Sequence, residues 1–591
     1  MNINITPLLT QAYQAFQNGQ VDIAESLATK VIGTQPGNFD ALYLSGVIHG
    51  LKGQHDAAAK ALKKAVSLVP QNPFAHYNLA KALMEQGRIR DAADHLKKSI
   101  KLEPNNPESE LNLGLCFMMQ NLFNEALPHL NQATKLKPNF IEAMVNQAIC
   151  LIELNDIEMA LEIAIATTNI SPTNDACWSA LGAVHFKKNN IVDAIYCYQK
   201  AIALDSHNFK HQVNLAKCHD NNGDTDKVIA AFNSALFLNP KNIDCLNSLA
   251  TIYIRQEKFA DALPLLNKAL ELEPDNSDVH LNLGILHFLK LDLERGWKEY
   301  EFRDKNKYLH GGPFQSSKRQ WSPKDTHDRL LIWGEQGIGD QIIYGSMLDD
   351  VSKIVSRLRV GVDDRLINLL KRSHPTLDMI SIKERPANST FDSYLPMASL
   401  GQYFRNHVTD FPTPKAFLKA DDDKVTAFKS QMPKGKLICG ISWKSKNNSV
   451  AESKSILTRE LLPLFKLNGA HFFNLQYLPE QEDLELFFHH QAPVQAFNDL
   501  DIFNDLDGLA AAIMACDVVV TVSNSTAHLS GALGKETLLL LSRAVGKFWY
   551  WNEYQGRNLW YPNIKVFQQK IEGDWSHPLA ELQKYLEQKI A

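Results

Sequence analysis

The chain has 591 residues, of which 45% are hydrophobic and 21% charged, and its formal net charge is −5. This length exceeds what one hydrophobic core organises, so we expect several folded domains. The slight acidity argues against the basic surface that nucleic-acid binding requires, so no nucleic acid is expected as a partner.

No segment reaches the roughly 20 apolar residues that a membrane-spanning helix needs, and the start of the chain lacks a signal-peptide pattern. The eight cysteines form no C-x-x-C pair, which favours buried thiols over metal ligands or disulfides. The acidic run at 421–423 falls in a predicted linker and is interpreted as solvated charge. We therefore expect a cytoplasmic protein with no membrane span, no metal and no cofactor.

The first half of the chain repeats with a period of 34 residues. Prolines mark the period at Pro36, Pro70, Pro104, Pro138, Pro172, Pro240 and Pro274. Small residues recur at two further places, represented by Ala80 and Ala92. The pattern predicts two antiparallel helices per unit that cross at small residues, with the proline after the second helix. It resembles the tetratricopeptide repeat, and it predicts an α-solenoid of about nine units over residues 1–310, the last unit being an atypical cap.

Asparagine recurs at the sixth place of five units: Asn78, Asn112, Asn146, Asn214 and Asn282. This place lies on the first helix of a unit, which lines the inner groove of such solenoids. An amide both donates and accepts, so a ladder of them could hold the backbone of an acceptor protein whatever its sequence. The ladder resembles that of the animal O-linked N-acetylglucosamine transferases. The alternative is that these asparagines bond only to neighbouring helices.

Residues 311–329 lack the period and contain the turn signal Gly311-Gly312-Pro313, so we predict a linker there. Beyond it, short apolar runs alternate with helical segments, which favours a mostly parallel sheet flanked by helices. The predicted strands are 330–333, 359–362, 379–382, 437–442, 471–476, 517–522 and 537–541, and two of the predicted helices are 342–358 and 506–515.

A proline-rich and acidic stretch at 412–423 divides this half into two unequal lobes. The predicted lobes are 330–420 and 421–591, both Rossmann-like, with the first reduced. Two such lobes facing a cleft are the GT-B arrangement, and ligands of such sheets bind at the carboxyl ends of the strands.

The first motif is a glycine loop between a predicted strand and a helix, formed by Gly334, Gly337 and Gly339 and followed by Asp340. Glycines allow a tight turn and a close approach of ligand to backbone. Asp340 at the helix start could be the catalytic base that removes a proton from an acceptor hydroxyl. The alternative is a plain helix N-cap.

The second and third motifs follow predicted strands of the second lobe. Lys444 could meet a donor phosphate as a point charge, or be a surface lysine. A loop of hydroxyls and an amide then opens a helix at Ser523, Asn524, Ser525, Thr526 and His528. Such a helix start binds anions, and His528 could donate to the leaving phosphate oxygen. The alternative is N-capping by Ser523 or Asn524 beside a packed histidine.

The aromatic cluster of Trp549, Trp551, Trp560 and Tyr561 fits sugar stacking and core packing equally well.

These motifs, together with Gln476 in Leu475-Gln476-Tyr477 and with Trp560-Tyr561-Pro562, resemble the bacterial tetratricopeptide-repeat glycosyltransferases that modify flagellin. The catalytic half is similar to the ADP-heptose lipopolysaccharide heptosyltransferases, and the overall order of domains is similar to O-linked N-acetylglucosamine transferase. The resemblance implies Asp340 as base, His528 at the leaving group and Gln476 among the donor-binding residues. This chain departs from the heptosyltransferases at residues 523–525, where Ser-Asn-Ser replaces Asp-Thr-Gly.

The resemblance implies an inverting, metal-independent protein O-glycosyltransferase. It would use a nucleotide sugar, with a CMP-nonulosonic acid as one candidate donor, to modify Ser or Thr of flagellin held by the repeat arm. Two alternatives stay open. One is transfer to lipopolysaccharide or another glycan, and the other is a non-catalytic repeat scaffold that binds a nucleotide. A homo-oligomer formed through the repeat arm is also left open.

Overall fold

The fold was analysed in a computed structural model, which describes residues 5–305, 314, 316–412, 416–445, 451–477, 479–490, 492, 494–543 and 548–591. The chain forms two compact units, residues 1–240 and 241–591. In the described part of the chain, no helix combines the length and the apolar character needed to span a membrane.

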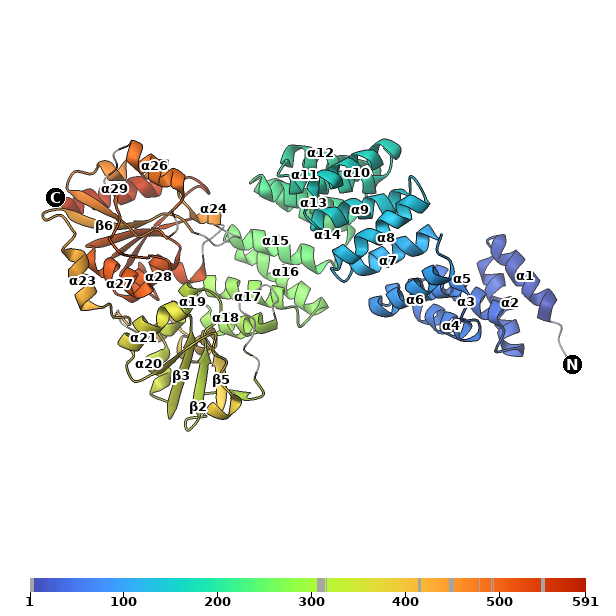
Figure 1. Cartoon of the computed structure of the whole chain (residues 1–591), viewed down its shortest axis with the longest axis horizontal. Helices are drawn as coiled ribbons and strands as arrows, with labels where there is room; N and C mark the ends of the chain where they lie inside the picture. The colour runs from blue at the N-terminus through green and yellow to red at the C-terminus, as the bar shows by residue number, and fades with distance from the viewer. Residues whose placement is uncertain are drawn as a thin grey trace. The chain divides into compact units, whose positions relative to one another are not determined.

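The first unit consists of seven helix pairs, which Figure 1 shows in blue to green. The helices are α1 (Ile5–Gln17), α2 (Val21–Thr34), α3 (Phe39–Leu51), α4 (His55–Leu68), α5 (Pro73–Glu85), α6 (Ile89–Leu102), α7 (Pro107–Met118), α8 (Phe123–Leu136), α9 (Ile141–Glu153), α10 (Ile157–Ile170), α11 (Asp175–Lys187), α12 (Ile191–Leu204), α13 (Phe209–Asn221) and α14 (Thr225–Leu238). The predicted solenoid of tetratricopeptide repeats is confirmed.

The small residues of the repeat lie where the helices of a pair cross. Ala80 and Ala92 are fully buried. A Cβ atom on Gly114 would lie 2.8 Å from Leu130 Cδ2 of the second helix, so only glycine fits this crossing without a shift. Seven of the second helices end two residues before the recurring proline, as α4 does at Leu68 before Pro70, and α12 ends at the same place of its repeat, Leu204, where Ser206 stands instead. Proline cannot extend the ladder of helical hydrogen bonds, and this fixes the end of the helix.

The second unit begins with two further helix pairs, α15 (Ile243–Arg255) with α16 (Phe259–Leu272) and α17 (Ser277–Leu289) with α18 (Leu293–Tyr300). A 3-10 helix, η1 (Glu301–Lys305), follows directly. The described residues therefore hold the nine predicted pairs. We expected the repeats to form a domain of their own to residue 310, but the compact units divide after Pro240. The reason is that the last pair packs into the core of the following lobes.

Trp297 of α18 is the centre of this packing. It is 1% exposed, its indole N–H donates to the carbonyl oxygen of Arg405 (2.9 Å), and its ring meets Trp549 edge-on at 5.5 Å between centroids. A Cβ atom on Gly401 would overlap the indole ring. The atypical last repeat is thus a cap that joins the solenoid to the next domain, as predicted.

Trp297→Ala is expected to lower the free energy of unfolding of this unit by about 3–5 kcal/mol, because a large buried ring leaves a cavity. Chemical denaturation measures the loss. The half-buried Trp178 of the first unit provides the matched control, since Trp178→Ala removes less buried surface. Equal losses for the two variants would contradict the central packing role of Trp297.

The first lobe contains a five-stranded parallel sheet of order β1-β5-β2-β3-β4. Its strands are β1 (Arg319–Gln320), β2 (Arg329–Trp333), β3 (Arg357–Val362), β4 (Asp378–Ser381) and β5 (Ser393–Pro396). Its helices are α19 (Ile338–Gly345), α20 (Leu348–Ser352), α21 (Ile367–Ser373) and α22 (Gly401–Phe404), with the 3-10 turns η2 (Asp364–Leu366), η3 (Asn388–Thr390), η4 (Met397–Leu400) and η5 (Val408–Asp410).

Two expectations for this lobe differ from the structure. The segment 311–329 is not only a linker, because β1 within it pairs with β5 and Trp321 beside it is 1% exposed. The helix expected over 342–358 is shorter, since β3 already begins at Arg357 and pairs with β2. Both differences arise where tertiary pairing overrides the local pattern.

The second lobe contains a six-stranded parallel sheet of order β13-β10-β9-β6-β7-β8. Its strands are β6 (Leu437–Ser442), β7 (Ala470–Asn474), β8 (Val494–Gln495), β9 (Val518–Val522), β10 (Thr537–Leu541) and β13 (Ile564–Gln568), beside a small hairpin of β11 (Glu553–Tyr554) and β12 (Arg557–Asn558). Its helices are α23 (Asp422–Lys429), α24 (Ala451–Lys454), α25 (Thr458–Leu461), α26 (Gln481–His489), α27 (Leu506–Ala515), α28 (Ser525–Ala532) and α29 (Ser576–Ile590), with η6 (Leu464–Lys466) and η7 (Trp549–Trp551).

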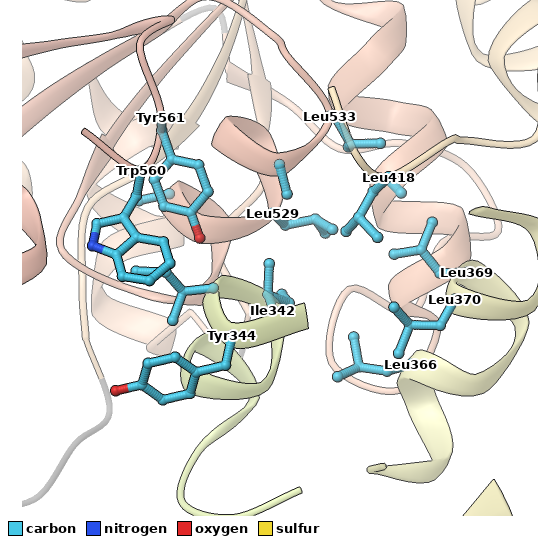
Figure 2. Packing of buried hydrophobic residues seen from close by; sticks show 14 of the residues in the cluster. Ile342, Tyr344, Leu366, Leu369, Leu370, Leu418, Leu529, Leu533, Trp560 and Tyr561 are labelled. Carbon is cyan, nitrogen blue, oxygen red and sulfur yellow. The ribbon is translucent and has the colours of Figure 1, made fainter. Parts of the chain in front are cut away.

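The two lobes share one apolar core, part of which is drawn in Figure 2. Ile342 of α19 and Leu529 of α28 belong to it, together with Leu418 from the segment between the lobes. This packing brings the start of α19 next to the start of α28. Each of these helices follows a strand, so both starts lie at carboxyl ends of strands, where ligands of such sheets bind.

Candidate functional site

A cavity of about 590 Å³ lies between the two lobes. The first lobe contributes Gln336, Gly337, Ile338, Gly339, Asp340 and Arg365, and the second contributes Ser445, Lys454, Tyr477, Ile502, Phe503, Leu506, Leu509, Ser523, Asn524, Ser525, His528, Phe548 and Tyr550. Two of the three predicted motifs therefore face the same space.

Asp340 is the third residue of α19, and its carboxylate accepts the backbone N–H of Gly337 (3.0 Å). Gly337 itself occupies the N-cap, and Asp340 caps the helix start from the third position, so the capping alternative describes part of its role although not its position. Burial in the cavity raises the pKa of Asp340 to about 6, and the charge of Glu335 adds to the effect. A carboxylate tuned in this way is ionised at neutral pH and is also a stronger base than an exposed one.

His528 lies on α28 and is 4% exposed. Burial first, and the charge of Lys454 second, lower the pKa of His528 to about 3, so the ring is neutral. Its Nδ1 lies 3.1 Å from the hydroxyl oxygen of Tyr561. If this hydroxyl donates, Nε2 carries the ring proton and is a hydrogen-bond donor.

Gly339 shows how closely the two helix starts approach. A Cβ atom at this position would lie 2.7 Å from Cδ2 and 3.2 Å from Nε2 of His528. Any larger residue would push the imidazole away. Gly334 is likewise constrained, because a Cβ atom there would lie 2.8 Å from the carbonyl oxygen of Gly361. Gly334 and Gly339 are thus required by close approach within the protein, while the predicted approach of a ligand to the loop backbone stays a prediction.

Asn524 is the N-cap of α28, and its side chain is fully used. Its Oδ1 accepts the N–H of Ala527 (3.2 Å) and the hydroxyl of Thr521 (3.0 Å), while its Nδ2 donates to Ser442 Oγ (2.8 Å) and to the carbonyl oxygen of Lys444 (3.3 Å). It therefore shapes the turn and has no hydrogen-bonding group to spare for a ligand.

The hydroxyls of this turn differ in what they can reach. Ser523 Oγ accepts the indole N–H of Trp551 (2.8 Å). Ser525 is half-buried and lines the cavity at the first turn of α28, where free backbone N–H groups attract anions. Thr526 is fully buried and its hydroxyl has no partner among the described residues, but it does not line the cavity. Ser525 rather than Thr526 is placed to meet a ligand.

Lys444 and Gln476, both expected to bind the donor, do not line the cavity. The ammonium of Lys444 pairs with Glu480 (2.6 Å) and Asp483 (2.7 Å) near the start of α26. Gln476 is fully buried, and its Oε1 accepts the backbone N–H groups of Trp443 (3.0 Å) and Lys444 (2.8 Å). Both residues brace the segment after β6, and the prediction that they contact the donor does not fit this geometry.

The sequence motifs did not reveal Lys454, which is one of the two cations, with Arg365, among the described lining residues. It ends α24, is 5% exposed, and its Nζ lies 3.9 Å from the ring centroid of Phe548. Burial lowers the pKa of Lys454 to about 8, against the opposing effect of Asp340. No pattern marks it in the sequence, because it lies ten residues beyond Lys444 in a polar stretch and reaches the site only through folding.

Another part of the cavity lining is mainly aromatic and apolar. Tyr477 and Phe503 lie with ring centroids 6.3 Å apart, and the guanidinium of Arg365 lies 5.0 Å from the Phe503 ring. Arg365 is already paired with Asp363 (2.9 Å). The cluster of Trp549, Trp551, Trp560 and Tyr561 is buried and absent from the lining, so core packing, one of its two interpretations, describes it.

The five ladder asparagines are all half-buried. In the first unit, Asn78 donates to the Tyr43 hydroxyl (3.0 Å) and Asn112 to the Tyr77 hydroxyl (3.4 Å), each from the preceding repeat. Asn146 donates to the carbonyl oxygen of Glu142 within its own helix (2.8 Å). In the second unit, Asn282 donates to Asn247 (2.9 Å). For Asn214 no side-chain hydrogen bond is described. Asn78, Asn112 and Asn282 thus bond to a neighbouring helix, as the alternative interpretation expects, whereas Asn146 bonds within its own helix. No hydrogen bond to the Oδ1 atoms of these four is described, so the amides keep acceptor capacity for a partner.

Family models match the repeats. "Anaphase-promoting complex, cyclosome, subunit 3" matches residues 17–99 and 187–269, and two tetratricopeptide-repeat models match residues 77–140 and 250–290. Among solved structures, the Cut9–Hcn1 hetero-tetramer has a TM-score of 0.37 at 18% identity, covering 47% of this chain and 55% of that one. A tetratricopeptide-repeat protein from Parabacteroides merdae has a TM-score of 0.38 at 15% identity, covering 42% and 97%.

Curated relatives were also found. Protein FlbA of Caulobacter vibrioides is 25% identical over 416 residues, which cover 60% of this chain and 69% of FlbA. The anaphase-promoting complex subunit CDC16 of Saccharomyces cerevisiae is 27% identical over 128 residues, covering 20% of this chain and 15% of CDC16. The FlbA match is longer than the repeats, which end near Tyr300, so it includes part of the second half. The chain is a tetratricopeptide-repeat protein with similarity to FlbA.

Proposed function

We propose that this chain is a nucleotide-sugar-dependent protein O-glycosyltransferase in which the two lobes form a GT-B-like module. One observation carries the proposal: Asp340 of the first lobe and His528 of the second line the same cavity. A base and a leaving-group stabiliser must face one another across the reacting sugar, and these residues come from the two motifs that suggested those roles. Lys454 and the start of α28 add positive potential on the side of His528.

The proposed step is an inverting displacement. Asp340 takes the proton of a Ser or Thr hydroxyl as its oxygen forms a bond to the anomeric carbon of the donor. On the opposite face the bond from that carbon to the phosphate oxygen breaks, and the electron pair leaves with the nucleotide. The Lys454 ammonium, the His528 Nε2–H and the N–H groups at the start of α28 stabilise the charge that develops there. Because the protein supplies these groups, the mechanism is proposed to run without a metal.

The proposed acceptor is flagellin held by the repeat solenoid, and one candidate donor is a CMP-nonulosonic acid. Tetratricopeptide arrays commonly present extended surfaces for other proteins. The ladder asparagines support the acceptor part of the proposal with their Oδ1 atoms, which can accept backbone N–H groups of an extended segment. A glycan acceptor would need no such arm.

Incubation of the purified chain with flagellin and a panel of nucleotide sugars tests the proposal by intact mass. A mass increase of one sugar on flagellin is expected. An increase on lipopolysaccharide alone would favour the glycan-directed alternative. A nucleotide that raises the Tm without any transfer would favour the non-catalytic scaffold, because a ligand bound only by the folded state stabilises it.

The rate of transfer is expected to follow a bell-shaped pH profile. Asp340 acts when deprotonated, so kcat/KM rises as the pH passes its pKa of about 6. Lys454 acts when protonated, so kcat/KM falls as the pH passes its pKa of about 8. Initial rates at subsaturating donor between pH 5 and 9.5 measure both limbs. A profile that stays flat from pH 5 to 9.5 would contradict the assignment of both groups.

A further inference from the structure

The solenoid ends in a buried arginine that binds the glycine loop. Arg303, in η1, is 2% exposed. Its Nε donates to Glu335 Oε2 (3.0 Å) and its Nη2 to Glu335 Oε1 (2.7 Å), which is a two-point pairing of guanidinium with carboxylate. Glu335 lies between Gly334 and Asp340 in the loop that follows β2. Arg303, at the end of the repeat cap, thus binds the loop that carries the proposed base.

Further hydrogen bonds stabilise the Arg303–Glu335 pair and the loop beside it. Arg303 also donates to Glu301 (2.9 Å) and to Ser399 Oγ (2.7 Å), and Glu335 accepts the backbone N–H of Ala398 (3.0 Å). The next loop residue, Gln336, exchanges hydrogen bonds with the Tyr300 hydroxyl (2.9 and 3.2 Å). Gln336 has φ of +59°, a left-handed backbone conformation that a non-glycine residue adopts at a cost. The cap therefore fixes a loop conformation that is unfavourable by itself.

We propose that Arg303 is a positioning residue for Asp340, acting through Glu335, so that the end of the repeat arm supports the reaction centre from outside the cavity. This inference rests on the proposed function. It assigns the cap a second role besides joining the solenoid to the lobes. Arg303 does not line the cavity, so its effect on the reaction is indirect.

The electrostatics give this role a measurable signature. The charged groups acting on Asp340 include Glu335 of its own loop and Lys454 of α24. The other titratable groups around it are neutral at working pH, namely Tyr300, Tyr344, Tyr550, Tyr561 and His528. Glu335 raises the pKa of Asp340 and Lys454 lowers it. Burial opposes the charge of Arg303, but Glu335 and Glu301 outweigh it and hold the guanidinium charged. Arg303 therefore offsets the influence of Glu335 on Asp340.

The test compares Arg303→Met, Arg303→Lys and Glu335→Gln with the wild-type chain in the transfer assay across pH. The acid limb is the rise of kcat/KM with pH that Asp340 controls. Arg303→Met leaves the Glu335 charge unpaired, so the acid limb is expected to move up by roughly one pH unit. Glu335→Gln removes that charge and is expected to move the limb down. Arg303→Lys keeps the charge but loses the two-point geometry, so it is expected to restore the limb while kcat stays reduced.

The control is Arg295→Met, since Arg295 lies exposed on α18 and forms its described ion pair with Asp292 (3.5 Å). It is expected to leave kcat and the acid limb unchanged. Opposite limb shifts in Arg303→Met and Glu335→Gln cannot come from a general loss of folding. If Arg303→Met does not fold, as judged by its Tm, Glu335→Gln decides alone. If the wild-type chain transfers sugar but the variants leave the acid limb unshifted, this inference alone is overturned. If the wild-type chain transfers no sugar, the proposed function is overturned and this inference with it.

Discussion

Asp340→Asn is expected to lower the rate constant of sugar transfer about 10²- to 10⁴-fold, the range that a positioned general base contributes. Asparagine has the shape of aspartate but cannot take up a proton. Its amide oxygen can still accept the Gly337 N–H that Asp340 now accepts, so the start of α19 is preserved. Donor affinity is expected to stay nearly constant, because the donor phosphate is proposed to lie against the other lobe.

Single-turnover rates at saturating donor and donor titration by calorimetry separate the two quantities. Asp349→Asn is the matched control, because Asp349 lies on α20 and pairs with His374 (2.7 Å) outside the cavity lining. Its rate is expected to equal that of the wild-type chain. An unchanged rate in Asp340→Asn would rule out Asp340 as the base, and weakened donor binding with an unchanged single-turnover rate would assign it to binding.

Lys454→Met is expected to weaken donor binding about 10- to 100-fold, because it removes a charge-assisted bond from a buried ammonium to the phosphate. Among the described lining residues, Arg365 and Lys454 are the cations, and Arg365 is already neutralised by Asp363. Methionine keeps the apolar contact with Phe548. Loss of the ammonium is also expected to move the acid limb up, since Lys454 lowers the pKa of Asp340.

Lys444→Met provides the comparison for this prediction. Its removal leaves Glu480 and Asp483 without their shared cation, so a lower Tm is expected with little change in donor affinity. Nucleotide titration of both variants measures the difference. The reverse order, with donor binding lost in Lys444→Met and kept in Lys454→Met, would restore the role that the sequence suggested for Lys444.

The solenoid was predictable because each unit repeats the same physical requirement. A crossing such as Gly114 against Leu130 admits only a small residue, and a proline follows seven of the nine second helices, so the period is visible without any alignment. The end of this domain was not predictable in the same way. The packing of Trp297 against Gly401 and Trp549 joins residues more than 100 positions apart, and no local pattern records it.

Strands such as β9 and β10 were predictable because a strand buried on both faces is a continuous apolar run. The edge strands β1 and β8 have only two residues each and were missed, and so were β5, which lies between β1 and β2, and the five-residue edge strand β13. Their strand character depends on the neighbour with which they pair. The first lobe is therefore larger at its edge than the sequence indicated.

The candidate site was predictable where a motif combines a strand end with a helix start, which placed Asp340 and His528 in one cavity. The site was not predictable where a charged side chain can bind either a ligand or nearby residues of the protein. Lys444 turns to two carboxylates near the start of α26, and Lys454 takes the place beside the cavity. The role of Arg303 was also hidden, because its partner Glu335 is 32 residues away.

The most direct test of the account is a crystal structure of the full chain with the one of CMP, UDP, GDP and ADP that raises its Tm most. The account predicts nucleotide phosphate within hydrogen-bonding distance of Lys454 Nζ and of the first backbone N–H groups of α28, with Asp340 across the remaining space. A nucleotide bound elsewhere, or in this cavity with its phosphate turned away from Lys454 and α28, would contradict it.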